Sequence, residues 1–207
     1  MPRSSHVAGT TRNPATTALL DRYLFTATVR ADGSSKFAAN NKWATFPAFA
    51  FAWKAIDEPF LKHAPVLSDL KVRLSYGKSG NQAIGAYQSL PAISGVGMTL
   101  NEAIVPAYVV TQLGNPNLRW ETTSQFDAGV DFGAFDNRLS GTVDVYRKNT
   151  YDLLQQITLA QNTGFSNAWI NSGNVSNRGV ELSAAFDVIQ SRKAGGLRWN
   201  VSANASH

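Results

Sequence analysis

The feature that most constrains the fold is a period-two alternation of apolar and polar residues between Trp120 and Asn149. The alternation is sustained on both sides of a short break, AFDNR, at residues 134–138. One phase comprises Phe126, Ala128, Val130, Phe132, Leu139, Gly141, Val143 and Val145; the other comprises Gln125, Asp127, Gly129, Asp131, Ser140, Thr142, Asp144 and Tyr146. Because successive side chains of a strand point to opposite faces, this pattern predicts two antiparallel strands, each with one apolar face, joined by a tight turn.

The same alternation recurs through most of the chain. It is clear in residues 22–31, 45–54, 70–77, 179–188 and 197–206, and weaker in residues 151–160 and 166–175. Segments rich in Gly, Asn, Asp and Ser separate these stretches, at residues 31–41, 113–117, 135–137, 175–179 and 192–196. Only residues 55–69 could hold a helical turn, and two prolines interrupt them. The fold class is therefore predicted to be all-β and antiparallel.

Two architectures share this pattern. In a soluble β-sandwich the apolar faces meet in a core, whereas in an up-and-down transmembrane β-barrel they meet lipid and the polar faces line the lumen. The alternating stretches run to about ten residues, longer than the mean of about five to six for soluble strands. Their apolar phases also mix large rings with small residues such as Ala27, Ala128 and Ala184, which acyl chains tolerate better than a close-packed core does. Aromatic residues near strand ends add to the preference for the barrel.

Composition excludes several functions. Charged residues make up 16% of the chain, and the net charge of +5 is scattered without a basic run, so no nucleic-acid partner is expected. Without cysteine, disulfides and thiolate sites are excluded. The chain shows no long apolar run and no signal peptide.

No enzymatic chemistry is predicted. The GKS at residues 77–79 follows a strand, but the Walker pattern would require glycine where Val72 stands, so we interpret it as a turn at a strand exit. His6, His63 and His207 lack metal-ligand spacing, and Asp57–Glu58 beside Pro59 indicates a turn. We therefore expect no catalytic residue, no metal site and no cofactor.

Five long strings resemble a known family. They are RADGSSKFAANNKWATFPAFAFAWK, LKVRLSYGKSGNQAIGAYQSL, LGNPNLRWETTSQFDAGVDFG, NRLSGTVDVYRKNTYDLL and TGFSNAWINSGNVSNRGVELS. Their order and content are similar to the SusC/RagA group of TonB-dependent outer-membrane transporters, over most of residues 21–207.

The resemblance implies a portion of a large transporter of the Gram-negative outer membrane. Members have a signal peptide, a plug domain and a 22-stranded barrel. They import oligosaccharides or peptides, driven by the TonB complex, and a SusD-type surface lipoprotein commonly covers the barrel. About eight strands are expected here, so the chain is interpreted as an internal or truncated part of the barrel, with outer-membrane lipid as a partner. Residues 1–20 are expected to be an irregular N-terminal segment, and residues 21–207 the partial barrel domain.

The same frame suggests which residues face the cargo route. The polar phase, including Asp127, Asp131, Asp144, Glu181, Asp187 and Arg198, is expected to line the lumen, mostly without a substrate role. Tyr87, Tyr108 and Phe165 on outer loops are weak candidates for cargo contacts, and the substrate-binding residues stay unknown.

The connections between the predicted strands differ in length on the two sides of the barrel. Short turns are expected at residues 134–138 and 175–179 on one side, and long connections at residues 31–42, 77–121 and 153–165 on the other. Residues 192–196 would then form a short turn on the side where long connections are expected, which is an exception to this pattern. A soluble β-sandwich that binds glycans and a siderophore receptor of the same barrel architecture stay open as alternatives.

Overall fold

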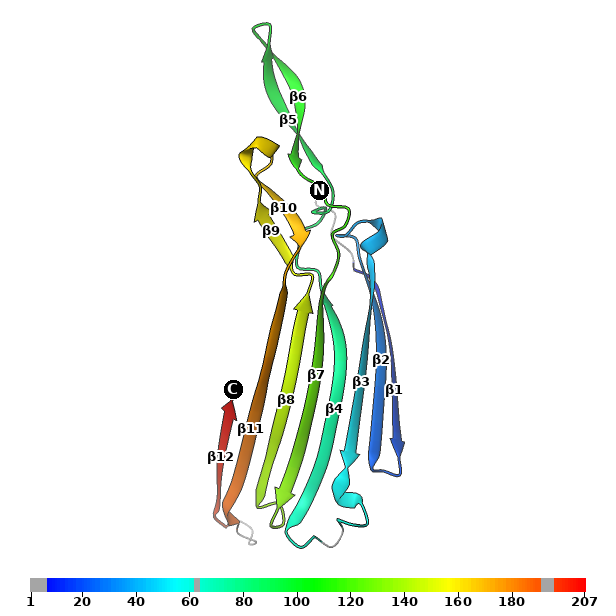
Figure 1. Ribbon diagram of the computed structural model, residues 1–207, viewed down its shortest axis with the longest axis vertical. Coiled ribbons are helices and arrows are strands. Elements are labelled where there is room, and N and C mark those ends of the chain that lie inside the picture. Colours follow the sequence, from blue (N-terminus) through cyan, green and yellow to red (C-terminus); the bar gives the residue numbers. More distant parts are fainter. Residues whose placement is uncertain (1–6, 62–63, 191–195) are drawn as a thin grey trace.

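The computed structural model describes residues 7–61, 64–190 and 196–207. Its main element is a single eight-stranded antiparallel sheet, which is tall, curved and open (Figure 1). In spatial order the strands are β1 (Val7–Leu19), β2 (Tyr23–Ser34), β3 (Trp43–Lys54), β4 (Leu67–Asn81), β7 (Glu121–Ala134), β8 (Leu139–Tyr151), β11 (Asn174–Gln190) and β12 (Arg198–Ser206). The predicted all-β antiparallel class is therefore confirmed.

The two ends of the sheet differ. At one end, which we call the loop end, residues 35–42, 82–120 and 152–173 connect the strands. Two hairpins project from the longer connections: β5 (Ala92–Leu100) with β6 (Ala103–Gln112), and β9 (Leu154–Thr158) with β10 (Asn167–Asn171) (Figure 1). The opposite end, the turn end, has the connections at residues 20–22, 55–66 and 135–138. The three short helical turns are η1 (Ala39–Asn41), η2 (Ala55–Asp57) and η3 (Gln161–Thr163).

The strand register places the predicted apolar phases on one face of the sheet. One row of paired residues crosses all eight strands, and each of its members is apolar: Leu19, Tyr23, Trp53, Val72, Val130, Val143, Leu182 and Ala205. No second layer covers this face in the described part of the chain, since Phe49 is 53% exposed and Leu182 47%. The sandwich alternative requires this face to be buried, and the structure contradicts it.

The buried core instead lies at the loop end. Phe37, Phe46, Ile84, Leu118 and Trp120 pack together there, and Leu118 is completely buried. The core lies where β3 and β4 separate. The backbone pairing of these two strands extends only from Lys54 with Lys71 to Ala48 with Gly77. Beyond it the ring of Phe46 occupies the space that a side chain on Gly80 would need.

Three local expectations were wrong. Residues 1–20 are not irregular throughout, because β1 occupies Val7–Leu19 by pairing with β2. Residues 175–179 are not a turn but part of β11, paired with β8. The GKS segment is not a turn at a strand exit either, since β4 continues through it to Asn81.

The predicted asymmetry of the connections is otherwise confirmed. The short turn at residues 135–138 lies at the turn end, and the three long connections lie at the loop end. Because residues 175–179 are not a turn, the connection between β11 and β12 falls at the turn end after all, where Gln190 pairs with Arg198. Residues 192–195 of that predicted turn lie outside the described residues. Residues 55–57 do form a helical turn, as expected.

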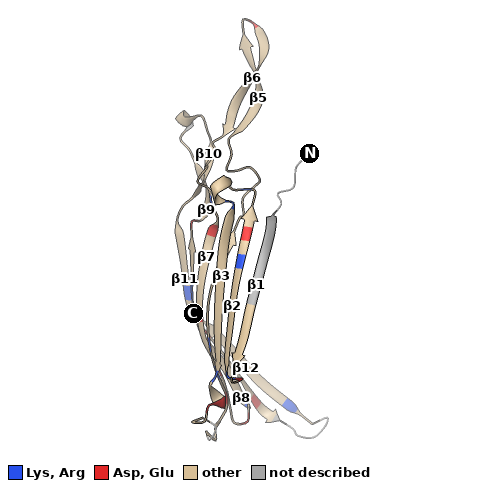
Figure 2. Ribbon diagram, turned by 90° about the vertical axis from the view of Figure 1, so that its right-hand side faces the viewer, with Lys and Arg blue, Asp and Glu red and all other residues tan. Residues whose placement is uncertain are grey.

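Within the described residues, no helix has the length and apolar character needed to cross a membrane. Charged side chains are sparse along the strands, which Figure 2 shows as mostly tan ribbons with isolated blue and red positions.

Candidate functional site

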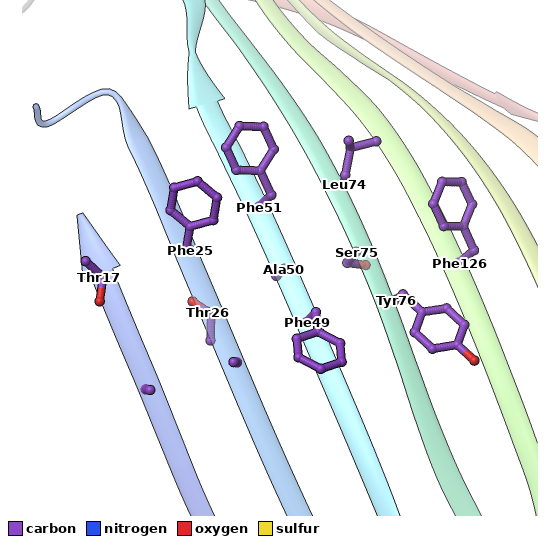
Figure 3. A pocket seen from close by; sticks show the side chains of 12 residues that line it. Thr17, Phe25, Thr26, Phe49, Ala50, Phe51, Leu74, Ser75, Tyr76 and Phe126 are labelled. Carbon is purple, nitrogen blue, oxygen red and sulfur yellow. The ribbon is translucent and has the colours of Figure 1, made fainter. Parts of the chain in front are cut away.

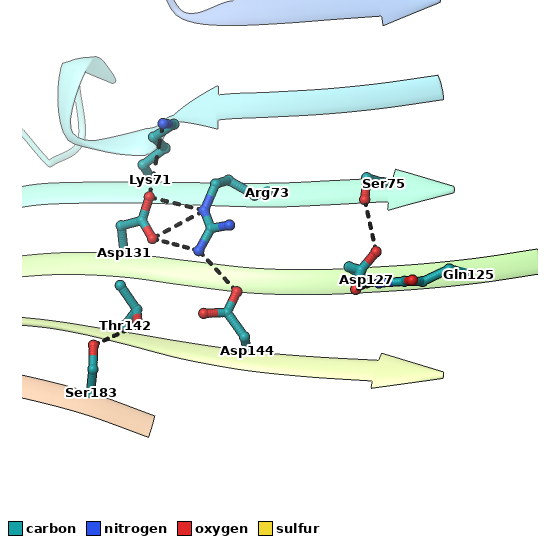
Figure 4. Close-up of polar contacts among 9 residues, drawn as sticks. All are labelled: Lys71, Arg73, Ser75, Gln125, Asp127, Asp131, Thr142, Asp144 and Ser183. Atoms are coloured by element: carbon teal, nitrogen blue, oxygen red, sulfur yellow. Dashed lines mark hydrogen bonds and ion pairs between the residues drawn. The ribbon is translucent and has the colours of Figure 1, made fainter. Parts of the chain in front are cut away.

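The polar face of the sheet carries an ion-pair network that spans three strands (Figure 4). Arg73 of β4 donates through Nε to both carboxylate oxygens of Asp131 on β7, at 3.0 Å each. Its Nη2 donates to Asp131 at 2.7 Å and also to Asp144 of β8 at 2.9 Å. Lys71 Nζ lies 3.8 Å from Asp131. Two cations thus offset two carboxylates, and the bridge fixes β4, β7 and β8 relative to one another.

Gly129 makes the longer arm of this bridge possible. It lies in register between Arg73 and Asp144 on the strand that the guanidinium must cross. A Cβ at Gly129 would collide with Asp144 Oδ1 and would come within 2.9 Å of Arg73 Nη2. A larger residue would therefore force the ion pair apart, which explains why the alternation has a glycine at this polar position.

Other polar-face contacts extend the network. Ser75 Oγ donates to Asp127 at 3.1 Å, and Gln125 Nε2 donates to the same carboxylate at 2.9 Å. The hydroxyls of Thr142 and Ser183 are 2.8 Å apart (Figure 4). This face is therefore a hydrogen-bonded, hydrophilic wall.

The structure brings some of the predicted lumen residues together and separates others. Asp131 and Asp144 share Arg73, and Glu181 pairs in register with Asp144, so two carboxylates stand side by side. Asp187 accepts a hydrogen bond from Asn200 at 2.8 Å, nearer the turn end, and Arg198 is also on this part of the sheet. The three aromatic candidates lie apart: Tyr87 in the segment before β5, Tyr108 on β6, and Phe165 between η3 and β10.

Sequence reasoning missed a buried carboxylate at the turn end. Glu58, only 8% exposed, accepts hydrogen bonds from Tyr23 Oη at 2.6 Å, Arg22 Nη1 at 2.9 Å and Trp53 Nε1 at 3.2 Å. The hydrogen bond from Tyr23 and then that from Trp53 lower the pKa of the Glu58 carboxyl, with help from Arg22 and against the opposing effect of burial. The clamp holds the connection between β3 and β4 against β2. The clamp could not be predicted from the sequence, because it depends both on the pairing of Tyr23 with Trp53 and on the path of the connection that carries Glu58.

The apolar face is hollowed between β1 and β7 (Figure 3). The hollow has a volume of about 420 Å³ and is lined by Ala15, Thr17, Phe25, Thr26, Ala27, Phe49, Ala50, Phe51, Leu74, Ser75, Tyr76 and Phe126. The rings of Phe25 and Phe51 lie 5.0 Å apart at its side. Four of the five aromatic rings that line the hollow are phenylalanines, which have no hydrogen-bonding group. The hollow therefore suits a hydrocarbon chain better than a polar ligand.

In the part of the chain that the structure describes, no three His, Asp or Glu residues come together in a way that could hold a metal ion. His6 and His63 lie outside the described residues.

Comparison with curated proteins gives relatives of one kind. The chain is 39% identical over 197 residues to the TonB-dependent receptor SusC of Bacteroides thetaiotaomicron, covering 90% of this chain and 19% of that protein. It is 41% identical over 186 residues to a TonB-dependent receptor of Formosa agariphila, covering 90% of this chain and 17% of the relative. The chain thus spans about a fifth of the length of the proteins it matches.

Solved structures agree. The RagAB peptide transporter superimposes with a TM-score of 0.77 at 33% identity, over 92% of this chain and 20% of that chain. The siderophore receptor PirA from Acinetobacter baumannii matches with a TM-score of 0.53 at 17% identity, which shows a shared fold alone. A profile of the TonB dependent receptor-like β-barrel family matches residues 15–207, almost the whole of the sheet described above. The chain therefore belongs to the TonB dependent receptor-like β-barrel family.

Proposed function

We propose that this chain is a section of the barrel wall of an outer-membrane transporter that imports oligosaccharides or peptides. The observation that carries the proposal is the apolar row in register across all eight strands, exposed on a face that no other layer of the described residues covers. Such a face is unfavourable in water and favourable in hydrocarbon, at about 25 cal/mol per Å² of apolar surface removed from water. The hollow at Phe25, Phe49 and Phe51 lies on the same face and would be filled by acyl chains.

On this proposal the polar face lines the lumen. Its network of Arg73, Asp131 and Asp144 gives the wall a hydrophilic surface past which a polar cargo could move. The protein would move its cargo without chemical conversion and would not act as an enzyme. Residues 21–207 would be one continuous part of the barrel domain, with β1 extending it towards the N-terminus.

The family also supplies partners for the proposal. A neighbour in structure is named as the RagAB peptide transporter, and a relative in sequence is SusC. We propose that the whole protein works with a SusD-like surface lipoprotein at the loop end and with the TonB complex on the opposite side, through segments other than those described.

The test uses the full-length protein in its own bacterium. A strain without the gene should fail to grow, or grow more slowly, on at least one oligosaccharide or peptide source, and the intact gene should restore growth. After cell fractionation the protein should sediment with the outer membrane and require detergent for extraction. A soluble protein, together with unchanged growth on every such source, would contradict the proposal.

A further inference from the structure

One short segment at the loop end, the last part of the 82–120 connection, contacts the earlier part of that connection and both of the other two connections. This hub segment, residues 113–121, contains the string LGNPNLRWE and leads directly into β7. Leu118 at its centre is completely buried, and Trp120 is nearly so. Four further residues, Asn115, Pro116, Arg119 and Glu121, each form hydrogen bonds to another part of the chain.

The first set of contacts reaches the connection between β2 and β3. Trp120 Nε1 donates to the carbonyl oxygen of Lys42 at 3.2 Å, and its ring lies 5.3 Å from that of Phe37. Asn41 Nδ2 donates to the carbonyl oxygen of Pro116 at 3.3 Å. Residues 35–42 are thus held through both backbone and ring contacts.

The second set reaches the segment that follows β4. The backbone N–H of Asn115 donates to the carbonyl oxygen of Ser89 at 3.0 Å. Ser89 Oγ in turn donates to the carbonyl oxygen of Lys36 at 2.9 Å, which ties the first and second connections directly. Asn81 Nδ2 donates to Glu121 Oε1 at 3.1 Å.

The third set reaches the base of the β9–β10 hairpin. Arg119 forms an ion pair with Asp152 at 2.7 Å. Asn171 Nδ2 donates to the carbonyl oxygen of Arg119 at 2.8 Å, and the backbone N–H of Arg119 donates to Asn171 Oδ1 at 2.9 Å. Asn115 Nδ2 donates to the carbonyl oxygen of Trp169 at 2.9 Å. Glu121 Oε2 accepts from the N–H of Leu154 at 3.1 Å.

We infer that the hub segment makes the three loop-end connections a single cooperative unit, so that loosening one of them loosens the others. Most of the hydrogen bonds satisfy a backbone group of one of the connections, and the core rings come from more than one connection. A displacement at the base of β9–β10 therefore cannot be absorbed locally; it moves Arg119 and hence the segment that also anchors residues 35–42. The β5–β6 hairpin is different. In the described residues its strands bond each other and, through Gln112, residues 87–90 of the same connection, so it stands outside the unit.

The test is hydrogen exchange in the full-length protein carrying Asn171→Ala. This substitution removes the bonds to Arg119 and Asp152 and touches nothing in residues 35–42. The protected N–H groups of Asn41, Leu90 and Ser172 report on the three connections. All three should exchange faster, by about tenfold, if the connections open together.

A matched control is Thr163→Ala, at the far tip of the same hairpin, where the hydroxyl bonds only Ala160 and Phe165. It should leave Asn41 and Leu90 unchanged. Faster exchange confined to Ser172 in the Asn171→Ala protein would overturn the inference. If that variant does not fold, Asn41→Ala gives the converse measurement: exchange at Ser172 should rise, and an unchanged rate there would overturn the inference equally.

Discussion

At the scale of single residues, the contacts that matter most join strands distant in sequence. Asp131 and Asp144 were predicted to be on the polar face, and they are, since a period of two fixes the face of each residue. Their partner Arg73 could not be predicted, because the pairing of β4 with β7 spans a long insertion whose length fixes no register. Glu58 was interpreted only as a turn residue, because its donors Arg22, Tyr23 and Trp53 are brought to it by the tertiary fold.

The Glu58 clamp predicts a pH dependence of stability. The pKa of the Glu58 carboxyl is lower in the folded protein than its ordinary value of 4.5. The contribution of Glu58 to the free energy of unfolding is therefore complete above pH 4.5 and is lost as the pH falls through the lowered pKa of the folded state. The melting temperature of the full-length protein in detergent should therefore fall below about pH 4.5. The Glu58→Gln variant should be less stable at pH 7 and should show a weaker fall; parallel curves for the two proteins would contradict this account.

Gly129 predicts a second residue-scale effect. Gly129→Ala should separate Arg73 from Asp144 and lower the free energy of unfolding by about 1–2 kcal/mol, measured by denaturant titration in detergent. Gly77→Ala is the control, because a Cβ there meets only Ala48 Cβ at an ordinary 3.4 Å. Equal losses for the two variants would show that glycine as such, and not the ion pair, sets the stability.

At the scale of elements, alternation predicted the long strands well and failed where pairing overrides local preference. β1 contains Thr, Asn and Pro with no apolar phase, and it forms because β2 pairs with it along most of its length, with one irregularity between Ala8 and Thr11. Residues 175–179 have turn-forming residue types but pair with residues 146–150 of β8. The loop-end core could not be predicted from periodicity, because its members come from irregular segments.

That core predicts unequal effects for two phenylalanines on one strand. Phe46 is buried between the separating ends of β3 and β4, whereas Phe49 points to the exposed apolar face. Phe46→Ala should lower the free energy of unfolding by about 3–5 kcal/mol. Phe49→Ala should change it by about 0.5 kcal/mol or less in detergent, which fills the vacated space. Similar losses in denaturant titration would place Phe49 in a core that the structure does not have.

At the scale of the whole molecule, the two faces of one strand should respond oppositely to a charge. Val143 belongs to the apolar row and Thr142, its neighbour on β8, to the polar wall. If the row faces hydrocarbon, Val143→Arg costs about 2–4 kcal/mol near the midplane. Full-length protein in the outer membrane should fall sharply for Val143→Arg and much less for Thr142→Arg, as measured by immunoblot. Equal amounts would contradict the assignment of the faces.

The early end of the β3–β4 ladder has a consequence for the spacing of the strands. Elsewhere neighbouring strands of the sheet are joined by backbone hydrogen bonds, which fix the spacing of the strands whatever the side chains are. Between Phe46 of β3 and Gly80 of β4, the space between the strands is filled by the ring of Phe46, which packs in the loop-end core. The width of the gap between β3 and β4 therefore follows the size of these side chains, whereas the spacing of the paired strands does not depend on side-chain size.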